Sequence, residues 1–153
     1  MPDLLIIPGQ GGKPLYQAID NAADGYAWAE PPPKGVAPAG ALPYRRLAAL
    51  KDWRTPSPII YTVEIAIDDA HVPELTQWYA EEHLAMLADV PGCLGASRYE
   101  ALTPSEFRFL ACYRFVEPGV PQTPAWIAAR STPWTLAMVV KFRASRRFIR
   151  RLV

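Results

Sequence analysis

The stretch IIYTVEIAID, residues 59–68, predicts a β-strand that leads directly into a helix. Tyr61, Val63 and Ile65 alternate with a second set of side chains, and the stretch is rich in the β-branched residues that favour strands. Two aspartates follow, which are typical helix N-cap residues. Apolar residues at helical spacing then predict a helix to about Asp89, where a Pro-Gly pair ends it.

After this helix the pattern returns to strands, so the order from residue 57 is β-α-β-β-α-β. The remaining expected elements are strands at 97–102 and 107–116, a short helix at 123–130, an apolar segment of open type at 136–141, and a last strand at 147–153. Such a ferredoxin-like α+β unit packs both helices on one face of a four-stranded antiparallel sheet. Its other face also carries apolar residues, so we expect a homodimer in which a second copy covers that face and closes a dimeric α+β barrel.

Residues 1–56 are interpreted as an N-terminal extension of the 57–153 domain. The segment EPPPKGVAPAGALP, residues 30–43, holds too much proline for a helix or a central strand, so we expect a Pro-rich connecting arm packed on the core. Helical spacing on either side of this arm predicts helices at 15–23 and 44–53.

Composition excludes several classes of protein. The 153 residues carry a formal net charge of +1, which gives no general attraction for nucleic acid, and the basic run RASRRFIRRLV is read as a charged edge strand. No apolar run is long enough to span a bilayer and no signal peptide is recognisable, so we expect a cytoplasmic protein that does not act at a membrane. Cys93 and Cys112 are isolated, which fits buried thiols and neither a metal site nor a disulfide framework.

The helix contains two carboxylates and a histidine within WYAEEHLAML, residues 78–87. On a helical wheel Glu82 falls between Leu75 and Trp78 on the buried face. His83 falls at the other margin of that face. A carboxylate in an apolar space needs a partner, so Glu82 either bonds a backbone amide or an arginine, or borders a pocket with His83. A pocket histidine can move a proton near neutral pH, whereas a half-exposed histidine bonded to a carbonyl is the alternative.

The run WYAEEHLAMLADVPGCLGASRYEA, followed by FRFLACYRF, resembles the W-Y-x-x-E-H-x-x-x-L-x-x-V-P-G-x-x-x-x-x-R-Y pattern of EthD-like proteins in the dimeric α+β barrel superfamily. The resemblance covers residues 58–153. It implies a ferredoxin-like protomer with a pocket between sheet and helices. It also implies that His83, which matches the helix histidine of the pattern, projects into this pocket.

Aromatic side chains are frequent in the segments expected around the pocket. We expect Tyr79 to act with His83 and Glu82 in catalysis, because a phenol can donate a hydrogen bond to a carbonyl or enolate oxygen. The expected substrate-binding side chains are Tyr61, Trp78, Tyr99, Tyr113 and Trp126.

The sequence therefore suggests a small enzyme without a cofactor that transfers a proton on a carbonyl or aromatic, polyketide-like molecule, as a cyclase, isomerase or monooxygenase. No metal is expected, and haem bound through His83 is a minor alternative. The other hypothesis is a non-catalytic dimeric ligand-binding or structural protein whose cavity is filled by residues 1–56.

Overall fold

The computed structural model describes residues 1–21, 23–54 and 56–153, and it confirms the β-α-β-β-α-β order from residue 59 onward. The strands of this unit are β5 (Ile59–Ile67), β6 (Cys93–Ala101), β7 (Phe109–Phe115) and β8 (Phe142–Leu152). The first helical region consists of a 3₁₀ turn (Asp69–His71), α1 (Val72–Trp78), a π-helical turn (Tyr79–His83) and α2 (Leu84–Ala88). The second consists of a 3₁₀ turn (Val120–Gln122), α3 (Pro124–Ala129) and α4 (Pro133–Val139), so the apolar segment of open type is mostly helical.

The N-terminal segment differs from the prediction, because it forms strands where helices were expected. Its elements are β1 (Leu4–Pro8), β2 (Leu15–Ala18), β3 (Gly25–Ala29) and β4 (Leu42–Lys51). The predicted helices at 15–23 and 44–53 are wrong because β2 pairs with β3 and β8, and β4 pairs with β1 and β6. These neighbours satisfy the backbone groups that a helix would have satisfied internally. The Pro-rich stretch is mostly the loop from β3 to β4, as expected for a connection. The expectation that it packs on the core is wrong, because nearly all of residues 31–41 are exposed.

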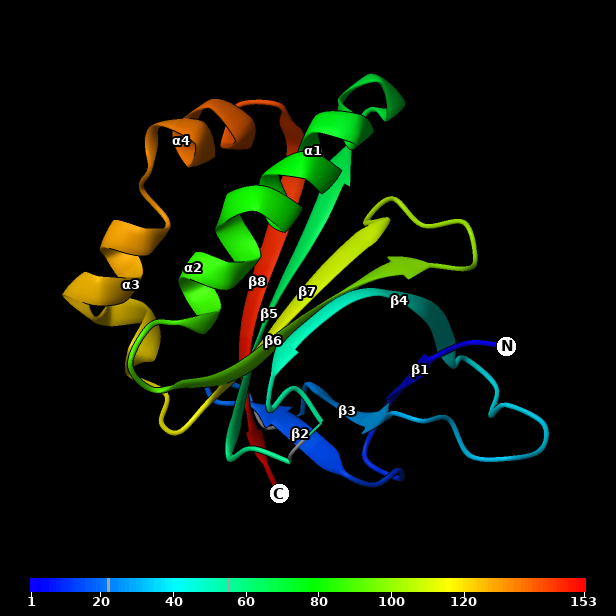
Figure 1. Ribbon diagram of the computed structural model, residues 1–153. Helices are drawn as coiled ribbons and strands as arrows, with labels where there is room; N and C mark the ends of the chain where they lie inside the picture. Colours follow the sequence, from blue (N-terminus) through cyan, green and yellow to red (C-terminus); the bar gives the residue numbers. More distant parts are fainter. Residues whose placement is uncertain (22, 55) are drawn as a thin grey trace.

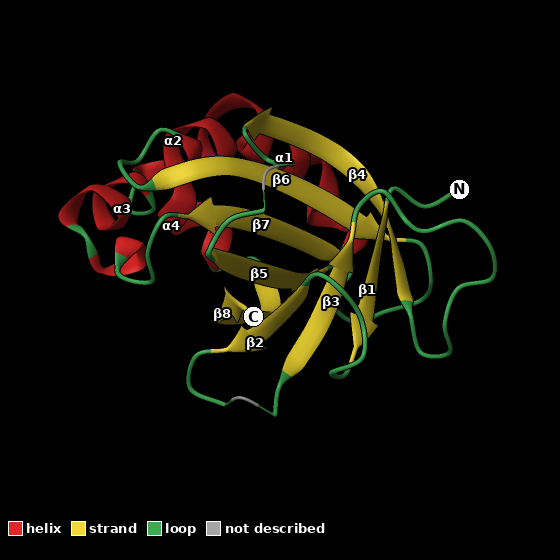
Figure 2. Ribbon diagram, turned by 90° about the horizontal axis from the view of Figure 1, so that it is seen from below, coloured by secondary structure: helices red, strands yellow, loops and turns green. Residues whose placement is uncertain are grey.

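All eight strands form one closed barrel in the order β1-β3-β2-β8-β5-β7-β6-β4 (Figures 1 and 2). The four strands of the ferredoxin-like unit are therefore half of a barrel and not a separate four-stranded sheet. Antiparallel pairing joins the two segments along two seams, β4 with β6 and β2 with β8. The sheet face that was expected to need a second copy is covered by this chain's own β1–β4. A homodimer stays a prediction, but it is not required to close the barrel.

Two apolar cores lie on the two faces of this sheet. One fills the barrel and includes Leu4, Trp28 and Tyr99, and the other lies between the sheet and the helices and includes Trp78 and Trp126. Helices α1 to α4 lie outside the barrel, over β5, β6, β7 and β8 (Figures 1 and 2). Cys93 and Cys112 are both free and buried, as predicted.

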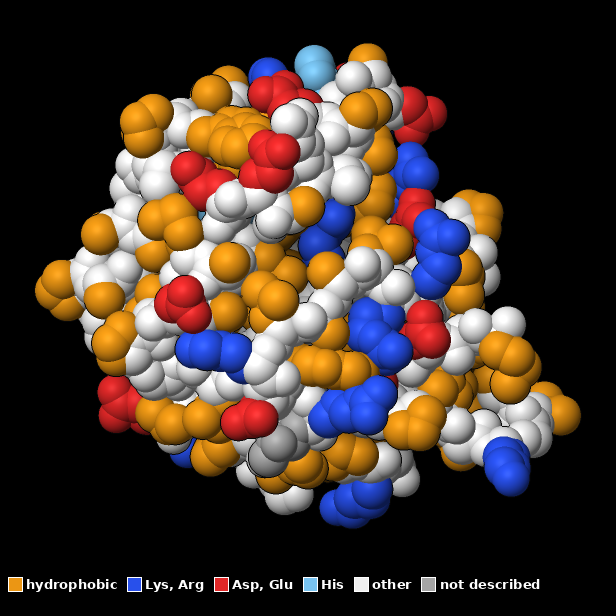
Figure 3. Space-filling view, in the orientation of Figure 1, with side chains coloured by type: hydrophobic (Ala, Val, Ile, Leu, Met, Phe, Trp, Pro, Cys, Tyr) orange, Lys and Arg blue, Asp and Glu red, His pale blue; other side chains and the backbone are white. Residues whose placement is uncertain are grey.

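The outer surface of the described ranges is mixed in charge. In Figure 3, Lys and Arg side chains gather over β4 and the neighbouring strand ends, whereas Asp and Glu side chains are scattered. None of the helices in those ranges has the length and apolar character needed to cross a membrane.

Candidate active site

The π-helical turn at Tyr79–His83 decides which side chains of the first helical region face the sheet. Such a turn adds one residue to the helix, so every later side chain is displaced by one position on the wheel, about 100°. His83 therefore occupies the inward position predicted for Glu82, and Leu87 occupies the one predicted for Met86. Accordingly, His83 and Leu87 are 8% and 2% exposed, whereas Met86 is 38% exposed.

Glu82 is turned away from the sheet and reaches His83 only through two threonines. The Thr132 hydroxyl lies 2.7 Å from Glu82 Oε2 and 2.9 Å from the Thr135 hydroxyl. Thr135 Oγ1 lies 3.5 Å from His83 Nδ1, which is the longest link, and accepts a hydrogen bond from Trp78 Nε1 at 3.3 Å. Thr132 is the N-cap of α4, where its oxygen also accepts from the Thr135 backbone N–H.

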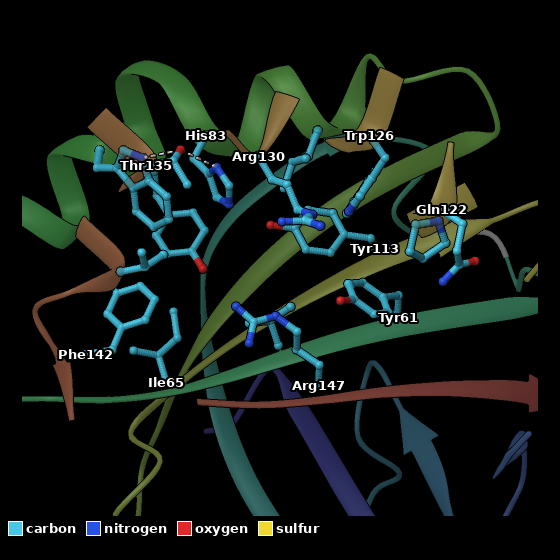
Figure 4. Close-up of a pocket in the computed structure, with 16 residues that line it drawn as sticks. Tyr61, Ile65, His83, Tyr113, Gln122, Trp126, Arg130, Thr135, Phe142 and Arg147 are labelled. Carbon is cyan, nitrogen blue, oxygen red and sulfur yellow. Dashed lines mark hydrogen bonds between the residues drawn. The ribbon is translucent and has the colours of Figure 1, made fainter. Parts of the chain in front are cut away.

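The donors and acceptors available in this chain favour one tautomer of His83. A carboxylate only accepts, so the single hydroxyl proton of Thr132 goes to Glu82, and the Thr135 hydroxyl must donate to Thr132. Thr135 then has no proton left and accepts from His83 Nδ1–H. The neutral ring consequently carries its lone pair on Nε2, and in Figure 4 this second ring nitrogen points into the cavity. A free imidazole lone pair is the arrangement of a proton acceptor.

The surroundings keep His83 neutral. Burial, which disfavours the charged imidazolium, and secondarily the nearby Arg147 lower the pKa of His83 to about 3. The ring is stacked on Trp78, with centroids 3.9 Å apart and planes 19° apart, so it is also held in orientation. Near neutral pH His83 is therefore unprotonated at Nε2 and has no proton to give there.

His83 faces a cavity of about 330 Å³ between the helices and the outer face of the sheet (Figure 4). Aromatic rings line its walls: Trp126 packs edge-on against Tyr61 and Tyr113, with centroids 5.9 and 5.2 Å apart. The full lining is Tyr61, Val63, Ile65, Trp78, Tyr79, His83, Leu87, Tyr113, Pro121, Gln122, Trp126, Arg130, Thr135, Val139, Phe142 and Arg147. All of these residues come from the 57–153 segment. The described part of the first 56 residues contributes none of the lining, because β1–β3 lie on the other side of the sheet and the helix-facing side chains of β4 line a different groove.

The charge of the cavity is positive. Arg130 from the end of α3 and Arg147 from β8 lie at its edge, and the described lining contains no Asp or Glu. Burial raises the pKa of the Tyr61 phenol, and the positive charges of Arg147 and Arg130 oppose this rise. The site thus offers a neutral base, aromatic walls and two cations, a combination that suits a flat molecule with an acidic proton and an oxygen that gains negative charge.

Most of the predicted site residues meet in this cavity. His83, Tyr79, Tyr61, Trp78, Tyr113 and Trp126 all line it. Tyr79 is fully buried, and burial raises the pKa of its phenol to about 12, so it remains a proton donor at any ordinary pH.

Two predicted residues lie elsewhere. Tyr99 points into the barrel, because side chains alternate along β6 and its neighbour Arg98 faces the helices. Its hydroxyl bonds the Glu30 carboxylate at 2.8 Å and Ser97 Oγ at 2.9 Å, so it serves the barrel core. Glu82 does not line the cavity, and it is paired with neither an arginine nor a backbone amide of the described residues. Its one hydrogen-bond partner among the described residues is Thr132.

Sequence reasoning missed Arg130, Arg147 and Thr135. Arg147 was grouped with a solvated basic run, although alternation along β8 places it on the same face as Ile149, which packs against the helix-side core. The Thr132-Pro133 pair is a helix-start signal that would have placed Thr135 one turn into α4.

The described residues offer little for a metal or a haem. No three His, Cys, Asp or Glu side chains of the described ranges lie close enough together to hold a metal ion. His83 Nε2 is free to bind a ligand, but a 330 Å³ cavity is at the lower end of pockets for drug-sized molecules, and a porphyrin with its propionates is larger than those. The cavity therefore does not fit haem.

Sequence comparison finds no matching family model and no matching curated protein. Solved structures do match over the whole chain, first a major regulator of staphylococcal pathogenesis, with a TM-score of 0.72, 11% identity and 100% of both chains covered. A heme-degrading enzyme from Listeria monocytogenes matches with a TM-score of 0.67 and 14% identity over 98% of this chain and 99% of the other. A ferredoxin-fold protein from Listeria monocytogenes, related to antibiotic biosynthesis monooxygenases, matches with a TM-score of 0.64 and 13% identity over 100% and 96%. At such low identity these matches show the fold: the chain has the ferredoxin-like α+β fold of proteins related to antibiotic biosynthesis monooxygenases, with β1–β4 included in the match.

Proposed function

We propose that this protein is a small enzyme that removes a proton from an aromatic or carbonyl compound without a cofactor, with His83 as the general base. The observation that carries the proposal is the orientation of His83: Nδ1 faces Thr135 Oγ1 at 3.5 Å, and Nε2 faces an aromatic cavity. The EthD-like sequence pattern supports this class of chemistry, and the monooxygenase-related and heme-degrading neighbours support a small enzyme at a coarser level.

In this mechanism the ligand's ring lies among Tyr61, Tyr113 and Trp126, and an acidic C–H or O–H points at His83 Nε2. The C–H or O–H bond breaks, the proton moves to Nε2, and the electron pair remains on the ligand as an enolate or phenolate. Arg147 or Arg130 stabilises the new anion. The anion also offsets the repulsion between Arg147 and the imidazolium, so His83 becomes a stronger base as the proton arrives.

The anion can then cyclise, isomerise or react with dioxygen, and the first proton transfer is common to all three outcomes. The non-catalytic alternative needed a cavity filled by residues 1–56. None of the described residues of that segment lines the His83 cavity, which favours the enzyme.

The first step can be measured without knowing the final product. Anthrone has an acidic CH₂ whose carbanion is an aromatic enolate, so its exchange with D₂O under anaerobic conditions reports proton removal directly by NMR. We expect the protein to accelerate this exchange and His83→Gln to reduce the acceleration by about 10² to 10⁴-fold, the usual contribution of a general base. His71→Gln, at the other histidine of the chain, is the matched control and should retain full activity.

Binding must be followed in the same samples, by quenching of the tryptophan fluorescence, to which Trp78 and Trp126 of the cavity contribute. If His83→Gln binds anthrone as the wild-type protein does and exchanges it equally fast, then His83 is not the base. If anthrone and an aromatic 1,3-diketone both quench the fluorescence but neither exchanges faster than in buffer, the cavity binds without catalysis.

A further inference from the structure

A second cavity of about 540 Å³ lies on the other side of the first helical region, between that region and β4. Its helical wall includes Val72, Ala80 and Leu84, and its opposite wall includes Leu47 and Leu50 of β4. Tyr79 is the one described side chain that lines both this groove and the His83 cavity. In Figure 3 the corresponding face, between α1 and β4, shows basic side chains beside hydrophobic ones.

Arg98 of β6 lines this groove and lacks a proper partner. The residue is 4% exposed, and its Nη2 makes no hydrogen bond with the described residues. Its guanidinium instead lies 4.4 Å from the ring centroid of Tyr79 and 5.6 Å from that of Phe109. Ring faces stabilise a guanidinium only in part, and a buried cation without a hydrogen-bonding anion is costly.

The nearby acid is already occupied. Glu100, two residues further along β6, is held by Arg45 at 2.5 Å and Arg108 at 2.6 Å. Both of these arginines also line the groove, so the described lining contains three arginines and one carboxylate. The groove therefore combines an excess of positive charge with apolar walls, and its deepest cation is the unpaired Arg98.

We infer that this groove binds a second small molecule, an amphipathic carboxylate. Its carboxylate would form charge-assisted hydrogen bonds with Arg98, because a guanidinium presents a planar fork that matches two carboxylate oxygens. Its hydrocarbon body would lie between the first helical region and β4, against Ala80, Leu84 and Leu47. A volume of about 540 Å³ suits a molecule of about the size of a medium-chain fatty acid. This site is separate from the proton-transfer cavity and does not depend on the reaction proposed there.

Decanoate is a suitable probe, with decanol as its uncharged match and decylammonium as the charge-reversed one. Isothermal titration of the full chain should show saturable binding of decanoate and at least tenfold weaker binding of the other two. Arg98→Met, which replaces the buried cation by an apolar chain of similar length, should lower decanoate affinity at least tenfold while leaving the protein folded. Ala80→Trp, at an exposed helix position that lines the groove, should block binding even if Arg98→Met does not fold.

The variant Arg147→Gln distinguishes binding in this groove from binding in the His83 cavity, because Arg147 lines only the His83 cavity. It should leave decanoate affinity unchanged. The inference is overturned if decanoate does not bind, if decanol binds equally well, or if Ala80→Trp retains binding. It is also overturned if Arg147→Gln abolishes binding, because the carboxylate would then occupy the His83 cavity. None of these results bears on anthrone exchange, which depends on His83.

Discussion

Because His83 is buried and neutral, it should make the free energy of unfolding depend on pH. The substitution His83→Gln should remove this part of the pH dependence. The folded-state pKa of about 3 lies below the ordinary value of 6.5. Between these two values the unfolded chain binds a proton that the folded protein does not, so the free energy of unfolding falls as pH falls through this window. Each unit in the window is worth about 1.4 kcal/mol, so His83 should reduce stability by about 2 kcal/mol between pH 7 and pH 5.

Urea unfolding of the wild-type protein and of His83→Gln at both pH values measures this term. Glu74 and Glu100, whose pKa values are lowered chiefly through their basic partners, lose their stabilisation at a lower pH and in both proteins alike. The wild-type protein should therefore lose about 2 kcal/mol more than His83→Gln on going from pH 7 to pH 5. Equal losses in the two proteins would mean that His83 titrates normally in the folded state, and the argument for a buried neutral base would fail.

Three further substitutions test the site. Thr135→Val removes the acceptor of the His83 Nδ1 proton and should lower the free energy of unfolding by about 1–3 kcal/mol. The rate of anthrone exchange should also fall, and Thr135→Ser should restore it. A purely structural role of Thr135 would instead leave the exchange rate of the folded fraction unchanged. Arg147→Gln removes the secondary cause of the low pKa of His83, so an NMR titration of the imidazole should show that pKa raised but still below 6.5; an unchanged pKa would remove Arg147 from the account. Deletion of Glu81 should convert the π-helical turn into regular helix while keeping His83 inward, so the variant should fold and still accelerate exchange; loss of exchange in a folded variant would refute the displacement argument.

The ferredoxin-like half of the fold could be predicted because its elements carry strong periodicity. β5 alternates between two faces and is bounded by clear helix-start signals, so its position and its successor follow from the residues alone. The strands of the N-terminal half could not be predicted in the same way. β2 is four residues long, and β4 carries Arg45, Arg46 and Leu47 in a pattern that also suits a helix. What makes them strands is their pairing with β8 and β6, residues that are remote in the sequence.

The site was predicted in part for a related reason. Its aromatic residues were found because large apolar side chains on the helix-facing side of β5 and β7 must pack somewhere, and the cavity lies there. The positions of Glu82 and His83 on the helix were predicted from a wheel with constant spacing. One extra residue in the turn moved His83 from the margin of the buried face into it and turned Glu82 outward, and a single sequence carries no visible sign of such an insertion.

The same extra residue explains why a histidine rather than a carboxylate faces the cavity. With regular α-helical spacing Glu82 would point between Leu75 and Trp78, and an ionised carboxylate there would pair with Arg147 across the cavity and cancel the charge that an anionic ligand needs. The π-helical turn places the acid outside, where Thr132 holds it, and leaves inside a ring that is neutral at working pH. Glu82 still influences the site. It accepts a hydrogen bond from Thr132, and this bond orients the hydrogen bonds through Thr135 that favour a free Nε2 on His83. The π-helical turn thus keeps the negative charge of Glu82 outside the cavity while His83 faces it. A neutral base and two cations can therefore share one small apolar space.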